Sequence, residues 1–387
     1  MPVKNRLAEL HDEITAWRRD LHENPEILYD IPRTSALVAE RLKAFGCDEV
    51  VTGIGRSGVV AVIRGKSDSA GRVVGLRADM DALPMQEQTG LAHASKTPNA
   101  MHACGHDGHT AMLLGAAKYL AETRNFDGTA VMIFQPAEEG GAGGKAMCDD
   151  GMMDRWNIQE VYAMHNSPGL PIGSFSIKSG PILASADEFR IRLQGRGGHA
   201  AKPHETVDTT VMASQLIVAL QSIVSRNVDP VKQAVLSVTS VETSSKAFNV
   251  IPDSVELRGT VRTHAPEVRA QIEERLTAVA RDIASAMGGR AEVVYDHGVP
   301  VTINAEAPTE YAREVAVAVS GGCEPGEMVM GGEDFSFMLE ERPGAMIRIG
   351  NGPSAGLHHP EYDFNDAAIP FGTSFFAELI ERRMPAA

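Results

Sequence analysis

Hydrophobic and polar positions follow two different periods along the first half of the chain. Helical spacing of apolar residues occurs at 5–24, 33–46 and about 109–122. Short apolar runs rich in β-branched residues, typical of buried strands, occur at 58–65, 73–76, 129–135 and around 161–164. Strands that alternate with helices in this way predict an α/β fold with a mixed sheet covered by helices on both faces.

The pattern changes at about residue 187. The expected elements are then a strand, a helix, two strands, a helix and a strand, at 187–194, 206–225, 234–242, 254–262, 266–286 and 290–295. This βαββαβ order is that of the split ferredoxin-like unit. Gly180-Pro181 before the block and Gly298-Val299-Pro300 after it are expected hinges. We therefore predict a discontinuous domain, 1–183 and 298–387, interrupted by an inserted ferredoxin-like domain at 184–297.

Composition narrows the classes of function. The 387 residues carry a formal net charge of −15 and no long basic run, which argues against nucleic acid as a partner. No apolar stretch resembles a signal peptide or a membrane span, so a membrane partner is not expected. Four dispersed cysteines suggest free thiols or a metal ligand rather than a disulfide framework. The expected location is the cytoplasm.

The densest polar cluster is HACGHDGH at 102–109. Cys104 and His106 are separated by one residue in a predicted loop, where both can turn towards one point, which suits zinc, cobalt, nickel or manganese. Gly105 and Gly108 let the backbone bend there. Two alternatives stay open: a solvated helix start capped by Asp107, and a Cys-His nucleophile pair.

Further acidic and histidine side chains follow predicted strands. Glu138 and Glu139 come after the strand at 129–135, and adjacent carboxylates at a strand end face different directions, so one can bind metal while the other addresses a water molecule. His165 ends the strand around 161–164, although a lone histidine there is more often structural. Asp79 and Asp81 share one side of an extended segment. His358 and His359 lie in a loop far along the chain.

Together these residues resemble the metallo-amidohydrolases that include hippurate hydrolase, N-acyl-amino-acid amidohydrolases and plant auxin-conjugate hydrolases, relatives of aminoacylase and of zinc carboxypeptidases. The resemblance spans nearly the whole chain, through WRRDLHENPE, RADMDALP, MHACGHDGHTAML, QPAEEGG, MHN, GRGGHAAKPH, NVIPDSVELRGTVRT, GGEDFSF and LHHPEYDFND. It implies the same two-domain layout, with the inserted domain used for dimerisation. It also implies hydrolysis of the amide bond of small N-acyl or N-aroyl amino acids.

The resemblance implies a role for each matching residue. Two divalent metal ions, manganese or zinc before nickel or cobalt, would be held by Cys104, His106, Glu139, His165 and His358. Neither Asp79 nor His359 is carried over as a ligand. Glu138 would take a proton from a metal-activated water, which attacks the carbonyl, and then deliver it to the leaving amine. Asp81 would orient a ligand.

Three residues of the inserted domain complete the expected site. His199 occupies the position that relatives use to stabilise the oxyanion, from the partner subunit of a homodimer or dimer-based oligomer. Asn249 and Arg262 are candidate contacts for the substrate carboxylate, since an arginine fork matches a carboxylate. Arg262 could equally be a surface strand residue, and His199 a loop histidine that caps the following helix.

Rival functions share parts of this pattern. A dipeptidase or carboxypeptidase would use the same metals and differ in the side pockets. A metal-dependent binding protein without catalysis would have no need for the base that Glu138 provides. A thiol hydrolase gives no reason for the further ligand-type residues.

Overall fold

A mixed eight-stranded sheet is built from the N-terminal and C-terminal parts of the chain, within residues 4–386, which the computed structural model describes. Its strands, in spatial order, are β1 (Glu49–Ile54), β2 (Gly58–Arg64), β4 (Thr129–Gln135), β3 (Val73–Asp79), β5 (Glu160–Ser167), β16 (Gly344–Gly350), β6 (Phe175–Ile177) and β15 (Glu324–Pro325). Every residue of β3 is buried, as expected for a strand covered on both faces. The predicted mixed α/β sheet is confirmed.

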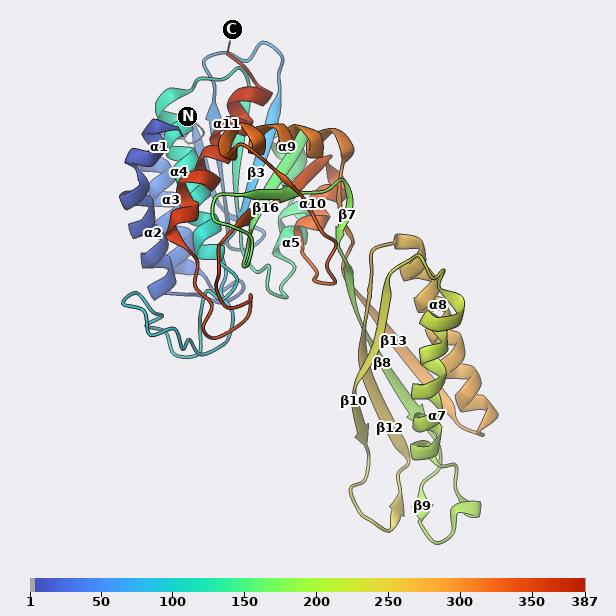
Figure 1. The fold of residues 1–387 in the computed structure, drawn as a ribbon. Helices are drawn as coiled ribbons and strands as arrows, with labels where there is room; N and C mark the ends of the chain where they lie inside the picture. The colour runs from blue at the N-terminus through green and yellow to red at the C-terminus, as the bar shows by residue number, and fades with distance from the viewer. Residues whose placement is uncertain (1–3, 387) are drawn as a thin grey trace. The chain divides into compact units, whose positions relative to one another are not determined.

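Helices cover both faces of this sheet (Figure 1). They are α1 (Asn5–Glu9), α2 (His11–Glu23), α3 (Pro32–Ala44), α4 (His106–Thr123), α5 (Gly143–Asp149), α6 (Met152–Arg155), α9 (Glu306–Ser320), α10 (Phe335–Glu341) and α11 (Ile369–Arg383). Alternate residues of the central strands pack into one large core with α2, α3, α4, α9 and α11, whereas α5 and α10 lie on the opposite face. The helix predicted over 5–24 is divided at Leu10 into α1 and α2.

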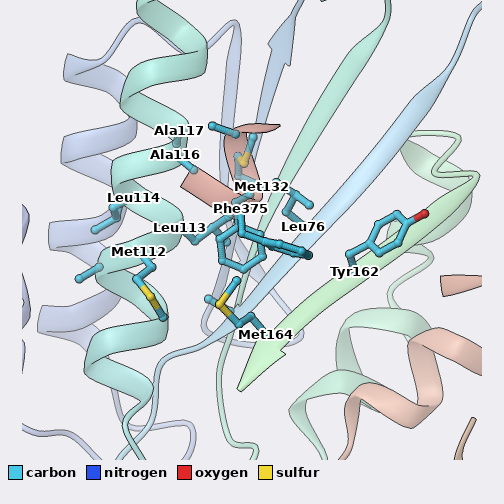
Figure 2. Packing of buried hydrophobic residues seen from close by; sticks show 14 of the residues in the cluster. Leu76, Met112, Leu113, Leu114, Ala116, Ala117, Met132, Tyr162, Met164 and Phe375 are labelled. Carbon is cyan, nitrogen blue, oxygen red and sulfur yellow. The ribbon is translucent and has the colours of Figure 1, made fainter. Parts of the chain in front are cut away.

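The core fixes the direction of the strands that carry polar residues. Figure 2 shows α4 packed through its apolar side chains against β3, β4, β5 and α11. Strands β3, β4, β5 and β16 are all parallel to one another, so their carboxyl ends reach the same edge of the sheet. Asp79, the last residue of β3, pairs with Gln135, the last residue of β4. Open α/β sheets place their ligands at this edge.

The start of α4 differs from the prediction. The helix begins at His106 instead of about His109, because Gly105 adopts a left-handed conformation (φ 88°) that ends the preceding loop. Asp107 then lies in the first turn, where a negative charge complements the helix dipole. The expectation that Cys104 and His106 share a loop is therefore wrong, since only Cys104 lies in the loop.

The middle of the chain forms a separate four-stranded antiparallel sheet with two helices. The elements follow one another as β8 (Ser185–Gln194), α7 (Thr209–Ser222), β10 (Ala234–Thr243), β12 (Ser254–Thr263), α8 (Pro266–Ala286) and β13 (Arg290–Val299). The sheet order is β10-β12-β8-β13. Its inner face and the apolar faces of α7 and α8 make a second core. Two short strands, β9 (Gly198–His199) and β11 (Val250–Ile251), pair beside it.

Contacts within the chain divide it into two units. One contains the described residues up to Gly180, Ile303–Glu327 and those from Asp334 onward, and the other contains Pro181–Thr302 and Met328–Glu333. The chain passes between them at β7 (Gly180–Leu183), at β14 (Thr302–Asn304), and again at either end of Met328–Glu333. The predicted domain limits at 183/184 and 297/298 lie near these crossings, and the division into domains stays a prediction. None of the helices in the described part of the chain is long and apolar enough to cross a membrane.

Candidate metal centre

Five side chains predicted as metal ligands meet where the parallel strands end and α4 begins. Ligand atoms of Cys104, His106 and His165 lie within 4.8 Å of one another, and so do those of Cys104, Glu139 and His358. The two groups share Cys104. The fold therefore brings together all five residues from four separate segments, with two overlapping positions at which a cation could be held.

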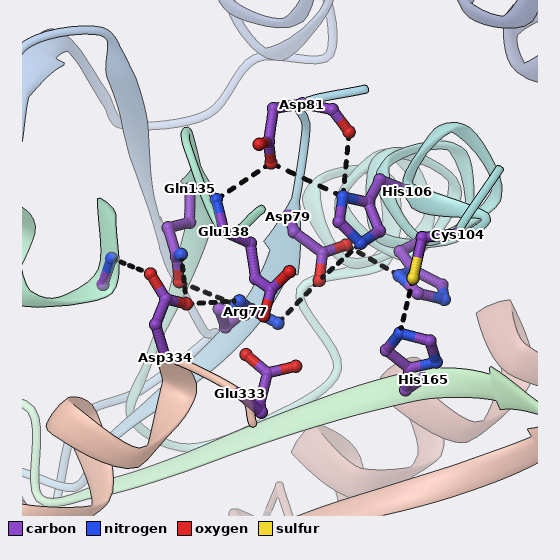
Figure 3. A network of polar contacts seen from close by, with 12 residues as sticks. Arg77, Asp79, Asp81, Cys104, His106, Gln135, Glu138, His165, Glu333 and Asp334 are labelled. Atoms are coloured by element: carbon purple, nitrogen blue, oxygen red, sulfur yellow. Dashed lines mark hydrogen bonds and ion pairs between the residues drawn. The ribbon is translucent and has the colours of Figure 1, made fainter. Parts of the chain in front are cut away.

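The buried His106 and the half-buried His165 have their ring orientations set by backbone carbonyls. His106 Nδ1 lies 2.8 Å from the carbonyl oxygen of Asp81, and His165 Nδ1 lies 2.7 Å from that of Asn166. Each Nδ1 therefore donates its proton to the carbonyl, which leaves Nε2 of the neutral ring free to bind a cation. His165 Nε2 is 3.4 Å from Cys104 Sγ, as Figure 3 shows. His106 Nε2 is buried and has no hydrogen-bond partner among the described residues.

Asp81 holds the two adjacent glutamates. Its carboxylate accepts hydrogen bonds from the backbone N–H groups of Glu138, at 3.0 Å, and Glu139, at 3.2 Å. Glu139 Oε1 lies 3.3 Å from His358 Nε2 and 3.9 Å from His106 Nε2. Asp81 thus contacts His106 through its carbonyl and the glutamate turn through its carboxylate. This is the arrangement of an orienting residue, although its functional role stays a prediction.

A main-chain hydrogen bond joins the loop that contains His358 to the loop that contains Cys104. The N–H of His358 donates to the carbonyl of Ala103 at 2.8 Å, and its backbone is left-handed, with φ 61°. The His358 side chain is 55% exposed, in contrast to the other four. His359 Nδ1 accepts the N–H of Glu361 at 3.2 Å, so His358 is the better placed of the two adjacent histidines.

Charge and burial suit a cation at this position. Burial raises the pKa of the Cys104 thiol well above its ordinary value, so a thiolate there needs a compensating positive charge. Burial, with the neighbouring His109 ring, lowers the pKa of His165 well below its ordinary value and keeps that ring neutral. The buried His106 Nε2 has no hydrogen-bond partner among the described residues. An unsatisfied buried polar atom costs about 1–3 kcal/mol, and a bound cation would remove that cost.

His109 and Asp79 also lie close to His106, but their polar atoms are already used. His109 donates from Nδ1 to Asp79 Oδ1 at 2.7 Å and accepts the Asn166 N–H on Nε2 at 2.9 Å. Asp79 Oδ2 accepts from Arg77 Nη1 at 2.7 Å. These bonds hold Asp79 and His109 in place beside His106, and the exclusion of Asp79 from the ligand set stays a prediction.

A buried network behind the centre was not predicted. Arg77 also donates to Gln135 at 2.8 Å and to Asp334 at 3.1 Å, and Asp334 accepts the Gly144 N–H at 2.7 Å (Figure 3). The motifs RADMDALP and GGEDFSF contain Arg77 and Asp334. Their place in these motifs is the one feature of the sequence that marks Arg77 and Asp334 as candidates. Their contacts cannot be predicted from the sequence because they depend on the pairing of β3 with β4.

The three predicted residues of the middle segment lie in the other unit. His199 is exposed on β9, where it pairs with Val250, and its Nδ1 accepts the Ala201 N–H at 3.0 Å. The carbonyl of Asn249 accepts the Ala200 N–H. Arg262 is half-buried on β12. The structure therefore places His199 and Asn249 on neighbouring segments, and the roles of all three residues stay predictions.

Gly105 offers a test of how tightly this region is packed. A Cβ at this position would lie 2.3 Å from Asn166 Nδ2 and 2.6 Å from the Tyr362 hydroxyl. We expect Gly105→Ala to destabilise the metal-free protein by about 1–3 kcal/mol from backbone strain and by a similar amount from crowding. Gly46→Ala is the matched control, since Gly46 also has a positive φ (81°) but no atom within 4 Å. Equal losses of melting temperature in the two variants would contradict the crowding.

The chain is similar to known metallohydrolases over nearly its whole length. Residues 75–382 match the model of peptidase family M20/M25/M40. Hippurate hydrolase of Campylobacter jejuni is 42% identical, with 96% of this chain and 97% of the relative covered. N-acetyl-L-cysteine deacetylase of Bacillus subtilis is 41% identical, with 97% and 89% covered.

A solved structure agrees with this similarity. A Bacillus subtilis protein described as a dinuclear metal binding peptidase of the M20 family has a TM-score of 0.86 at 35% identity, with 98% of this chain and 100% of that chain covered. The matches in sequence and in structure both extend over the two units. The chain therefore belongs to peptidase family M20/M25/M40 and is a hydrolase of that family.

Proposed function

We propose that this enzyme hydrolyses the amide bond of N-acyl or N-aroyl amino acids at a centre that holds two divalent metal ions. The observation that carries the proposal is the pair of overlapping ligand groups that share Cys104, with Glu138 directly beside the ligand-type Glu139. The names of the two relatives, hippurate hydrolase and N-acetyl-L-cysteine deacetylase, support an acylated amino acid as substrate.

The donor set fits divalent ions of intermediate softness. Cys104, His106, His165, Glu139 and His358 would hold two ions through one thiolate, three imidazoles and one carboxylate, a combination that suits zinc, manganese, nickel or cobalt. When bound, such ions supply Lewis acidity that polarises a carbonyl oxygen and makes water more acidic.

Glu138 would move the proton. Its carboxylate belongs to a group with His106 and Glu139, within reach of a water molecule held there. It would accept the proton of the attacking water and then donate it to the amine that leaves, so one carboxylate serves as base and acid. Asp81 would keep the carboxylate in place through its bond to the Glu138 N–H.

Two rival functions differ in substrate or in nucleophile. A dipeptidase or carboxypeptidase would use the same centre with a peptide. A thiol hydrolase would use Cys104 as nucleophile beside His165, but the raised pKa of Cys104 opposes thiolate formation without a cation.

A substrate screen tests the proposal. The purified protein would be given N-acetyl, N-benzoyl, indole-acetyl and aminoacyl conjugates of amino acids, and metal content would be measured on the same sample. We expect hydrolysis of acyl or aroyl amino acids by protein that contains about two metal ions per chain. Turnover of dipeptides alone would favour the peptidase, and no turnover by fully loaded protein would favour a binding function.

We further infer that the middle unit is a ferredoxin-like dimerisation domain. Its outer strand β10 has a strand partner on one side within the described residues, which leaves an edge for pairing. Helix α7 exposes Val211 and Val218, two turns apart, with 46% and 71% of their surfaces accessible. Together the edge and the apolar helix face favour a homodimer through this unit.

In such a dimer, His199 would act on the partner's site as an oxyanion donor. Because each active site then needs residues from two chains, an inactive Glu138→Gln chain mixed with an inactive His199→Ala chain should recover part of the activity. Loss of one such donor typically lowers the rate by about 10²–10³-fold, so recovery is measurable above either parent. Purified heterodimers without any recovery would show that His199 does not act across the interface.

A further inference from the structure

Arg18 is a buried arginine that contacts two segments carrying the candidate ligands. It lies on α2 and is 1% exposed. Its Nη1 is 3.4 Å from Asp107 Oδ2, its Nε donates to Asp366 Oδ1 at 2.8 Å, and its Nη2 donates to the Phe364 carbonyl at 3.0 Å. The same Nη2 lies 3.3 Å from His93 Nε2 and 3.7 Å from Asp363 Oδ1.

The two segments are far apart in sequence and carry different ligands. Asp107 follows His106 directly at the start of α4. Phe364 and Asp366 end the stretch that begins at His358, and that stretch contains no helix or strand before Asp366. The arginine guanidinium has several N–H donors in a rigid planar fork, so it can hold these two segments at a fixed separation. The ammonium group of a lysine lacks this fixed geometry.

We propose that Arg18 is a positioning residue that sets His358 against Cys104 and His106, and so governs the affinity of the metal ion bound by Cys104, Glu139 and His358. This proposal rests on the metal centre proposed above. It names a role for WRRDLHENPE, a motif whose residues supply no metal ligand or proton carrier.

The effect should be selective for one of the two ions. In the group of Cys104, His106 and His165, His106 begins α4 and His165 lies on β5, so this group depends less on the loop of His358 than the group that contains His358 itself. That loop has other ties, through the His358 N–H to Ala103 and through the Tyr362 hydroxyl to Asn166 at 2.7 Å. Without Arg18 we therefore expect weaker binding at the second position, not its loss.

Cobalt titration of the metal-free protein tests the proposal. The wild-type protein and the Arg18→Gln variant would be titrated with Co²⁺ and followed by visible absorbance and calorimetry. We expect Arg18→Gln to bind its first ion as the wild type does and its second about 10–100-fold more weakly, the usual effect of removing an outer partner of a ligand. Melting of the metal-free proteins would be recorded alongside.

Arg19→Gln is the matched control. Arg19 is the next residue, is 50% exposed, and donates to the same Asp366 at 2.9 Å. We expect this variant to bind both ions as the wild type does. Asp366→Asn weakens the same link from the other end, and it decides the question if Arg18→Gln does not fold.

Two results would overturn the role of Arg18: unchanged binding of both ions, or an equal weakening of both, in the variant that folds. If the wild-type protein itself binds no cobalt, the proposed metal centre fails together with this proposal. If the wild type binds two ions and the variant does too with equal affinities, the role of Arg18 alone fails.

Discussion

Replacing Glu138 by Gln is expected to lower kcat for N-acyl amino acid hydrolysis by about 10²–10⁴-fold, the range typical of general acid–base catalysis. Glutamine has the same shape but cannot accept and return a proton. The backbone N–H of residue 138 can still donate to Asp81, so the turn should keep its form. Activity would be measured on protein whose metal content has been determined.

The neighbouring glutamate provides the control for this experiment. Glu139 lies within 3.9 Å of both His106 and His358, so Glu139→Gln should reduce metal content as well as activity. Glu138→Gln should retain both ions. A Glu138→Gln enzyme that keeps near wild-type kcat, or loses its activity only in proportion to lost metal, would contradict the proton-carrying role.

The Cys104→Ala variant is expected to lose most of its bound metal and to fall in activity by at least about 10²-fold, more than removal of an outer partner would cause. Cys104 belongs to both ligand groups, so its removal weakens both ion positions at once. Metal content after gel filtration and kcat on the same sample would measure the effect.

Cys148→Ala provides the comparison for Cys104→Ala. Cys148 is also a free, buried cysteine, and it lies on α5 outside the two ligand groups that share Cys104. We expect this variant to retain its metal and its activity. Equal metal loss in both variants would mean that a buried cysteine matters for packing rather than for binding an ion.

Local sequence patterns predict much of the fold and of the candidate site. The β-branched runs of β2, β3 and β4 are dense enough to identify buried strands, and parallel pairing of β3 with β4 and β5 brings their carboxyl ends together. Of the ligand-type residues, His165 lies near the carboxyl end of β5, Glu139 follows β4, and Cys104 and His106 lie just before and at the start of α4. Their meeting at one edge is thus a consequence of topology that the pattern could predict.

Other features depend on contacts between distant segments. The bonds of Arg18 to Asp107 and Asp366 join three parts of the chain, and no periodicity in any of them signals the others. The hydrogen bonds from the Tyr362 hydroxyl to Asn166, and from the Asn166 amide to the Cys104 carbonyl, likewise join segments that are far apart in the sequence. The start of α4 differs from the prediction because the left-handed conformation of Gly105 depends on tertiary contacts. The side chains of Asn166 and Tyr362 fill the space that a Cβ at this position would need.

We expect hydrolysis by this enzyme to depend on two metal ions at this centre. The most direct measurement is to strip the protein with a chelator, remove the chelator, and titrate Mn²⁺ or Zn²⁺ back while following hydrolysis of an N-acyl amino acid. We expect no turnover by the stripped protein and a rise in turnover that saturates at about two ions per chain. Full turnover by protein shown to be free of metal would contradict it.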